Sequence, residues 1–172
     1  MGNATTDPKP GTAWDLVHTR TAALREIIAA LDAGGDLRWD DSASGLFADR
    51  DDLLQALHGV WSRRLQGRID IALELDERRL DESVAAAWVH TNADLPGVRR
   101  ILDEHADEPA LRQLERAQLR AIAVAAGLAT FDDPIAHSAA AGAQLVRRQR
   151  GRTPASPRRP SLGRRLLVAF AG

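Results

Sequence analysis

The longest amphipathic pattern in the chain runs from Gly45 to Leu75 and predicts one long helix. Asp49 suits its N-cap, because an aspartate side chain can accept hydrogen bonds from the free backbone N–H groups of a first turn. Arg64 and Arg68 fall within the apolar face, and no other predicted helix places two arginines there. Apolar residues at helical spacing predict that single buried face, made of Leu53, Leu57, Val60, Trp61, Ile71 and Leu75.

Three interpretations of Arg64 and Arg68 are open. Their aliphatic stems can lie along apolar neighbours while the guanidinium groups reach water. They can instead pair with an acid on another helix, or offer a guanidinium fork to a carboxylate or phosphate ligand between helices. The last interpretation predicts a ligand pocket floored by Trp61, Arg64 and Arg68, which His58 and His105 would join only through tertiary packing.

Five further helical segments are predicted around the long one. The first runs from Thr12 to about Leu31, and Gly34 and Gly35 follow it, since glycine favours the chain reversal after a helix. A polar loop over residues 36–48 leads to the long helix. The later segments begin with an N-cap aspartate or with a proline, which is tolerated in a first helical turn. They cover residues 81–95, 96–105, 109–126 and 134–148.

The helix predicted over residues 109–126 has an alanine-rich face, which would let another helix approach closely. No segment shows the apolar and polar alternation that is typical of strands. The sequence therefore predicts an all-α fold, a single bundle of about six helices over residues 12–149. The predicted buried positions of the alanine-rich helix are Leu111, Leu114, Ala117, Gln118, Ala121, Val124 and Ala125.

Charge is divided sharply between the body of the chain and its C-terminal end. Residues 1–146 hold 15 basic and 24 acidic side chains, a net charge of −9, whereas residues 147–172 hold eight arginines and no acid, a net charge of +8. Residues 1–11 are predicted as a disordered arm and residues 150–172 as a flexible, arginine-rich tail with an apolar end. The eight arginines are Arg147, Arg148, Arg150, Arg152, Arg158, Arg159, Arg164 and Arg165.

Several roles are open for the arginine-rich tail. It can bind a polyanion such as nucleic acid through counterion release, with little sequence preference. It can fold back on the acidic body, or remain a solvated end. Its apolar terminus, with Leu162, Leu166 and Phe170, can also dock on a protein partner.

The chain lacks the common motifs of catalysis and cofactor binding. It has no cysteine, no phosphate-binding glycine loop, no GxSxG elbow and no Glu-x-x-His pair. No cofactor and no metal site is therefore predicted, and a non-enzymatic protein is favoured. No run of 18 apolar residues predicts a membrane span, and no signal peptide is recognised at the N-terminus, so a cytoplasmic location is expected.

The segment GLFADRDDLLQAL, residues 45–57, resembles the junction in TetR-type regulators where the recognition helix ends and the next helix begins. Phe47, the turn with Asp49, Arg50 and Asp51, and the following leucines carry this resemblance. The preceding DLRWDDSASG contains no helix-turn-helix of the length that family needs. The resemblance implies an α-helical ligand-binding dimer without the DNA-reading module.

Three hypotheses of function follow, in this order. The first is a non-enzymatic α-helical interaction or regulatory module whose tail contacts a polyanion or a protein partner, with a homodimer as a further possibility. The second is a helical domain that binds a small ligand near Arg64 and Arg68. The third is a metal-binding helical enzyme that uses the dispersed histidines.

Overall fold

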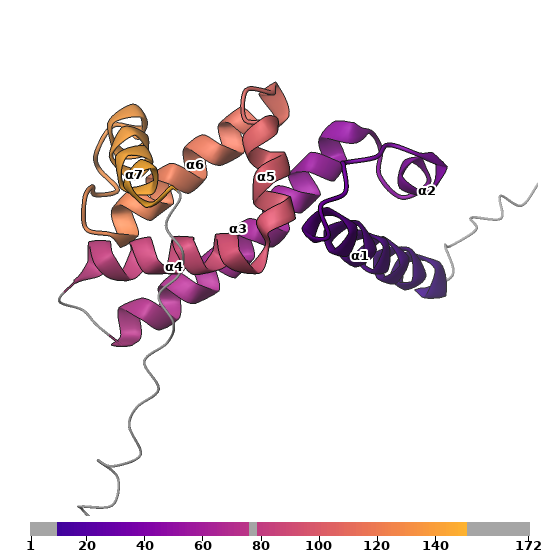
Figure 1. Ribbon diagram of the computed structural model, residues 1–172, viewed down its shortest axis with the longest axis horizontal. Helices are drawn as coiled ribbons and strands as arrows, with labels where there is room; N and C mark the ends of the chain where they lie inside the picture. The colour runs from indigo at the N-terminus through magenta and orange to yellow at the C-terminus, as the bar shows by residue number, and fades with distance from the viewer. Residues whose placement is uncertain (1–9, 76–78, 151–172) are drawn as a thin grey trace, which may run out of the picture.

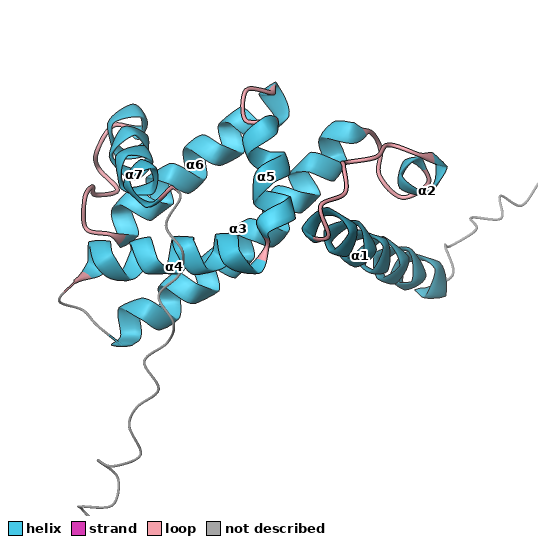
Figure 2. Ribbon diagram, in the orientation of Figure 1, coloured by secondary structure: helices cyan, strands magenta, loops and turns pink. Residues whose placement is uncertain are grey.

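The computed structural model describes residues 10–75 and 79–150, and every regular element in these ranges is an α-helix (Figures 1 and 2). The predicted all-α fold is thus confirmed, with six longer helices and the single turn α2. The helices are α1 (Pro10–Asp32), α2 (Asp41–Ser44), α3 (Arg50–Leu75), α4 (Leu80–Asp94), α5 (Pro96–Glu104), α6 (Pro109–Ala125) and α7 (Ile135–Gln149). None of the helices in the described ranges is both long and apolar enough to cross a membrane.

Helix α3 is a central element of the fold. It contacts α1, α4, α5 and α6, and α6 in turn packs against α7. In Figure 1, α1 and α2 lie at one end of the molecule, α7 lies at the other, and α3 runs between them. The predicted scaffold helix thus contacts four of the other helices, and α4, which contacts α3, α5, α6 and α7, is equally central.

A reciprocal pair of aspartates starts α3. The backbone N–H of Asp52 donates to Asp49 Oδ1 at 2.8 Å, and the Ala48 N–H donates to Asp52 Oδ2 at 3.0 Å. Arg20 of α1 forms an ion pair with Asp52 at 2.7 Å. The Ala48 hydrogen bond and the Arg20 guanidinium hold the pKa of Asp52 below its usual value. Asp49 is therefore the N-cap that the sequence predicts.

The buried face of α3 differs from the prediction in its C-terminal half. Leu65 and Ile69 are buried there, whereas Ile71 and Leu75 are 60% and 81% exposed. Trp61, Leu65 and Ile69 belong to the buried core, and α4 and α6 pack against α3. Arg64 and Arg68 share the side of Ile71 and Leu75 and stay partly exposed, which reduces the cost of burying their charges.

Two glycines set the distances between neighbouring helices. A Cβ atom at Gly97 would overlap the Leu31 carbonyl group of α1, and one at Gly142 would overlap the Leu119 carbonyl oxygen of α6. The Gly97 N–H also donates to Asp32 Oδ1 at 2.8 Å, so the last residue of α1 caps the start of α5. The pairs α1–α5 and α6–α7 therefore depend on the absence of these two side chains.

Several predicted boundaries shift by a few residues. Helix α1 begins at Pro10 rather than Thr12, and the predicted loop 36–48 contains α2. Asp81 lies in the first turn of α4, and the N-cap position is Arg79. The predicted starts of α5 and α6 at Pro96 and Pro109 are confirmed. Residues 1–9 and 151–172, which include most of the predicted arm and tail, lie outside the described residues.

Candidate functional site

A cavity of about 310 Å³, here called the central cavity, opens between α3, α4, α5, α6 and α7. Its volume is in the range of small-molecule pockets. Its lining combines apolar and aromatic side chains with side chains of both charges. The apolar wall includes Trp61, Trp88, Leu119, Ile122 and Val146, and the charged lining residues are Arg99, Asp103, Glu115, Arg147 and Arg150.

Arg99 of α5 is the buried charge of this cavity, with only 9% of its surface exposed. Its Nη2 atom lies 3.0 Å from Asp103 Oδ1 and 3.1 Å from Glu115 Oε1. Its guanidinium carbon also lies 4.9 Å from the centre of the Trp61 ring. The Nε atom of Arg99 is buried and has no hydrogen-bond partner among the described residues. Arg99 is therefore held firmly while it keeps one unused donor.

Three polar side chains of α3 lie at or next to the cavity: Trp61, Ser62 and His58. Trp61 Nε1 donates to Asn92 Oδ1 at 3.0 Å, and the Ser62 hydroxyl bonds to the Gln118 side chain. His58 is 5% exposed, and its Nε2 atom has no partner within the described residues. Burial lowers the pKa of His58, and the nearby Glu115 carboxylate opposes that effect only in part. His58 is thus held in its neutral form near pH 7.

Arg147 and Arg150 stand at the end of the cavity where α7 terminates. Arg150 pairs with Asp103 at 3.1 Å, so one arginine of the predicted tail contacts the acidic body. Arg147 donates only from Nε, to the Ala143 carbonyl oxygen at 3.3 Å, and forms no ion pair in the described part of the chain. The cavity is lined by three arginines and two carboxylates, which leaves one positive charge uncompensated.

The structure does not bring the predicted ligand-binding residues to one place. Trp61 lines the central cavity, and His58 is buried nearby on the same helix. Arg68 lines a different hollow, between α3 and α4, and Arg64 lines neither. His105 lies at the end of α5, where Nδ1 is 2.6 Å from a Glu108 carboxylate oxygen.

Arg64 and Arg68 share one acid on another helix. Asp94, at the end of α4, accepts from Arg68 Nη2 and lies 3.8 Å from Arg64 Nε. The side chains of Arg64 and Arg68 are 57% and 33% exposed. The geometry matches the ion-pair interpretation, in a partly solvated rather than a buried form, with the arginines at the margin of the apolar face.

Sequence reasoning missed Arg99, Asp103 and Glu115. Arg99 and Asp103 are four residues apart, which is the spacing of an ordinary surface ion pair on a helix. The available signal was position, because Arg99 follows Val98 and stands two residues before Ile101 on a nine-residue helix whose other inner residues are buried. An arginine in that position must be paired or must line a site.

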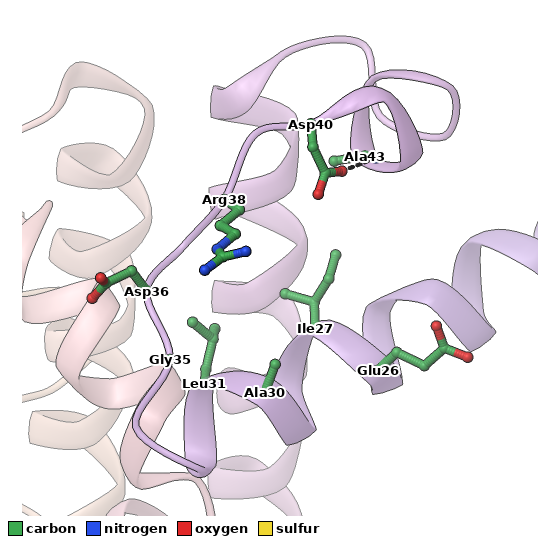
Figure 3. Close-up of a pocket in the computed structure, with 9 residues that line it drawn as sticks. All are labelled: Glu26, Ile27, Ala30, Leu31, Gly35, Asp36, Arg38, Asp40 and Ala43. Carbon is green, nitrogen blue, oxygen red and sulfur yellow. Dashed lines mark hydrogen bonds between the residues drawn. The ribbon is translucent and has the colours of Figure 1, made fainter.

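A second hollow, of about 340 Å³, lies between α1 and the segment that leads to α2 (Figure 3). Arg38 points into this hollow toward Ile27 and Leu31, whereas Glu26 points away from it. Arg38 is itself exposed, and no buried charged side chain lines this space. The central cavity, which contains a buried and paired arginine, is therefore the stronger candidate site.

Residues 10–75 and 79–150 contain no group of three or more histidine, aspartate or glutamate side chains placed to hold a metal ion. No family model, curated protein or solved structure matches the chain. The comparisons therefore add no support to the resemblance of residues 45–57 to TetR-type regulators.

Proposed function

We propose that this chain is a non-enzymatic helical binding module whose central cavity takes a small amphipathic ligand with one negative charge. The observation that carries the proposal is Arg99, buried against Trp61 on the wall of the cavity. A buried arginine is costly unless it is paired. The two carboxylates of the lining pair with Arg99 and Arg150, so the third arginine, Arg147, has no counterion among the described residues.

The chemistry of the lining defines the ligand. An apolar body would lie against Trp61, Trp88 and Ile122, where removal from water stabilises binding at about 25 cal/mol per Å². An anionic group would lie near Arg147, whose terminal nitrogens have no carboxylate partner in the described part of the chain. A monocarboxylate with a flat or branched apolar body meets both requirements.

The probe for this proposal is 1-anilinonaphthalene-8-sulfonate, an apolar anion whose fluorescence rises in a dry site. We expect saturable binding at one site, weakened about tenfold or more in R147E because a charge-assisted hydrogen bond is lost and a repulsion added. Arg148→Glu is the matched control, since Arg148 is exposed on the same turn and does not line the cavity. Equal affinity of both variants and the parent chain would reject the site.

A cavity-filling variant separates this site from nonspecific adsorption. Ala143 lines the central cavity, and A143L should reduce probe binding while leaving the helical circular dichroism unchanged. Medium-chain carboxylates such as octanoate should displace the probe, whereas octanol should do so less well. Equal displacement by octanol and octanoate at the same concentration would show that the negative charge does not contribute to binding.

The arginine-rich C-terminal end supports a second candidate function, binding of a polyanion or of a protein partner, in the cytoplasm. Arg147 and Arg148 are exposed at the end of α7, where the basic run begins. Removal of residues 151–172 should weaken binding to heparin and flatten its dependence on salt, because fewer counterions are released. Unchanged heparin affinity after this deletion would reject the role of the tail.

A further inference from the structure

The outer face of α6 carries an open apolar groove of about 600 Å³, here called the α6 groove. Ala117 and Ala121 form its floor, although the sequence predicts them to be buried. Phe131 and Ile135, from the start of the α7 region, form one wall and are 79% and 50% exposed. A groove with a small-residue floor and large exposed walls is shaped to receive a helix.

Two arginines line the α6 groove. Arg116 and Arg120 are four residues apart, so they project from the same side of α6. Arg120 donates to the Phe131 carbonyl oxygen at 2.6 Å, and neither arginine forms an ion pair within the described residues. An occupant of this groove should therefore combine an apolar stripe with negative charges.

The C-terminal end of α3 has those properties. Ile71 and Leu75 are four residues apart and largely exposed, and together they form an apolar stripe. Asp70 and Glu74 flank that stripe with the same spacing and are exposed. Among the described residues, Asp70 accepts only from the uncharged Gln66 side chain, at 2.7 Å. No described arginine pairs with either acid.

We propose that two copies of the chain associate by placing the end of α3 of one copy in the α6 groove of the other. Ile71 and Leu75 would cover the alanine floor and contact Phe131, while Asp70 and Glu74 would pair with Arg116 and Arg120. Each partner surface offers two charges that have no ion-pair partner among the described residues and are spaced one helical turn apart. Arg68, which lies beside Ile71, is already paired with Asp94, so the remaining charges of the two surfaces are complementary in sign.

The two surfaces lie at the same end of the molecule, which allows a reciprocal association. The end of α3 and the connection between α6 and α7 both lie at the left-hand end of the molecule in Figure 1. Two copies can therefore exchange these surfaces across a two-fold axis, which closes the assembly as a dimer. The chain's own C-terminal residues are a poorer occupant, because their arginines would meet Arg116 and Arg120 with like charge.

The test is a charge exchange read by sedimentation velocity. The parent chain should be dimeric, and both R116E/R120E and D70R/E74R should be monomeric, with dissociation constants raised at least tenfold. Mixed in equal amounts, the two variants should restore the dimer, because each contact then joins opposite charges. R25E/R63E is the control for R116E/R120E, since it makes the same change in net charge, −4, at exposed sites outside both surfaces.

Three results would overturn the proposal. These are a monomeric parent chain at 100 µM, a dimer that survives both pairs of substitutions, and two monomeric variants that do not recombine. Circular dichroism of each variant shows whether the helices are intact. If either variant is unfolded, A121E in place of R116E/R120E and L75S in place of D70R/E74R test the same two surfaces, and both should be monomeric.

Discussion

The guanidinium carbon of Arg99 lies 4.9 Å from the centre of the Trp61 ring, and the two residues come from different helices. A cation over an indole face is attracted by the negative face of the ring, by about 1–2 kcal/mol when water is excluded. This contact joins α5 to α3 at the wall of the central cavity. It also makes the cavity wall sensitive to any change in the charge of residue 99.

Arg99→Met should lower the free energy of unfolding by about 3 kcal/mol, because it leaves Glu115 without its counterion in a mostly buried position. The Glu115 side chain is only 18% exposed, so water cannot fully replace the arginine. Urea denaturation followed by circular dichroism measures the loss.

The double variant R99M/E115Q separates this charge effect from lost packing. It removes both charges and should recover at least half of the loss, since an uncharged pair needs no counterion. A double variant no more stable than R99M would contradict the assigned role of Glu115.

The stability of the protein should fall as the pH drops below about 6.5, the ordinary pKa of histidine. Burial lowers the pKa of His58 in the folded state, so the unfolded chain binds a proton at a pH where the folded chain does not. The free energy of unfolding therefore falls as the pH drops from the pKa of His58 in the unfolded chain to its pKa in the folded chain. Stability is greatest above that pH window.

Urea midpoints measured between pH 7.5 and pH 5.5 test this dependence. His58→Gln should reduce the slope, because the proton uptake by the unfolded chain at this position is then lost. The carboxyl groups of Asp52 and Asp133 have lowered pKa values, so they titrate below this range and do not interfere. A slope in His58→Gln equal to that of the parent protein would show that another group causes the pH dependence of stability.

Gly142→Ala should destabilise the protein by about 1–3 kcal/mol, because the added methyl group overlaps the Leu119 carbonyl oxygen and forces α7 away from α6. Gly67→Ala is the control, since nothing lies within 4 Å of a Cβ atom at that exposed position of α3. That substitution should be neutral or stabilise by up to about 1 kcal/mol. Thermal unfolding distinguishes the two, and a stabilised Gly142→Ala would contradict the observed helix contact.

Asp49→Ala should cost about 1 kcal/mol, the usual value of an N-cap aspartate. Its carboxylate accepts the Asp52 N–H at 2.8 Å, whereas Asp51 forms no such bond among the described residues. Asp51→Ala should therefore cost less in the same denaturation experiment. Equal losses of stability in the two variants would show that the negative charge near the start of α3, rather than the N-cap hydrogen bond, stabilises the helix.

The sequence predicts helix existence and most helix ends because those depend on local chemistry. Pro96, Pro109 and Gly127 act within one turn of their own positions, and Gly127 has the positive φ of 68° that glycine permits at a helix end. Which face of a helix is buried depends on partners that are distant in sequence. On α3 and α6 the predicted faces were therefore partly wrong, at Ile71 and Leu75 and at Ala117 and Ala121.

The candidate site was less predictable than the fold for the same reason. Trp61 was named from the sequence and does line the central cavity. Its charged neighbours Arg99 and Glu115 are 16 residues apart and come from different helices, α5 and α6. No spacing in the sequence predicts that contact. The helical periodicity places Arg64 and Arg68 on the buried face, whereas the tertiary packing leaves them partly exposed.

The missing side chain at Gly142 bears on how this protein could be redesigned. Leu119, which that glycine contacts, also lines the central cavity, so the spacing of α6 and α7 sets the width of the space between them. A larger residue at position 142 would push α7 away from α6, which would widen the cavity and lower the stability of the protein. Substitutions at this one position should therefore change the width of the central cavity and the stability of the protein together.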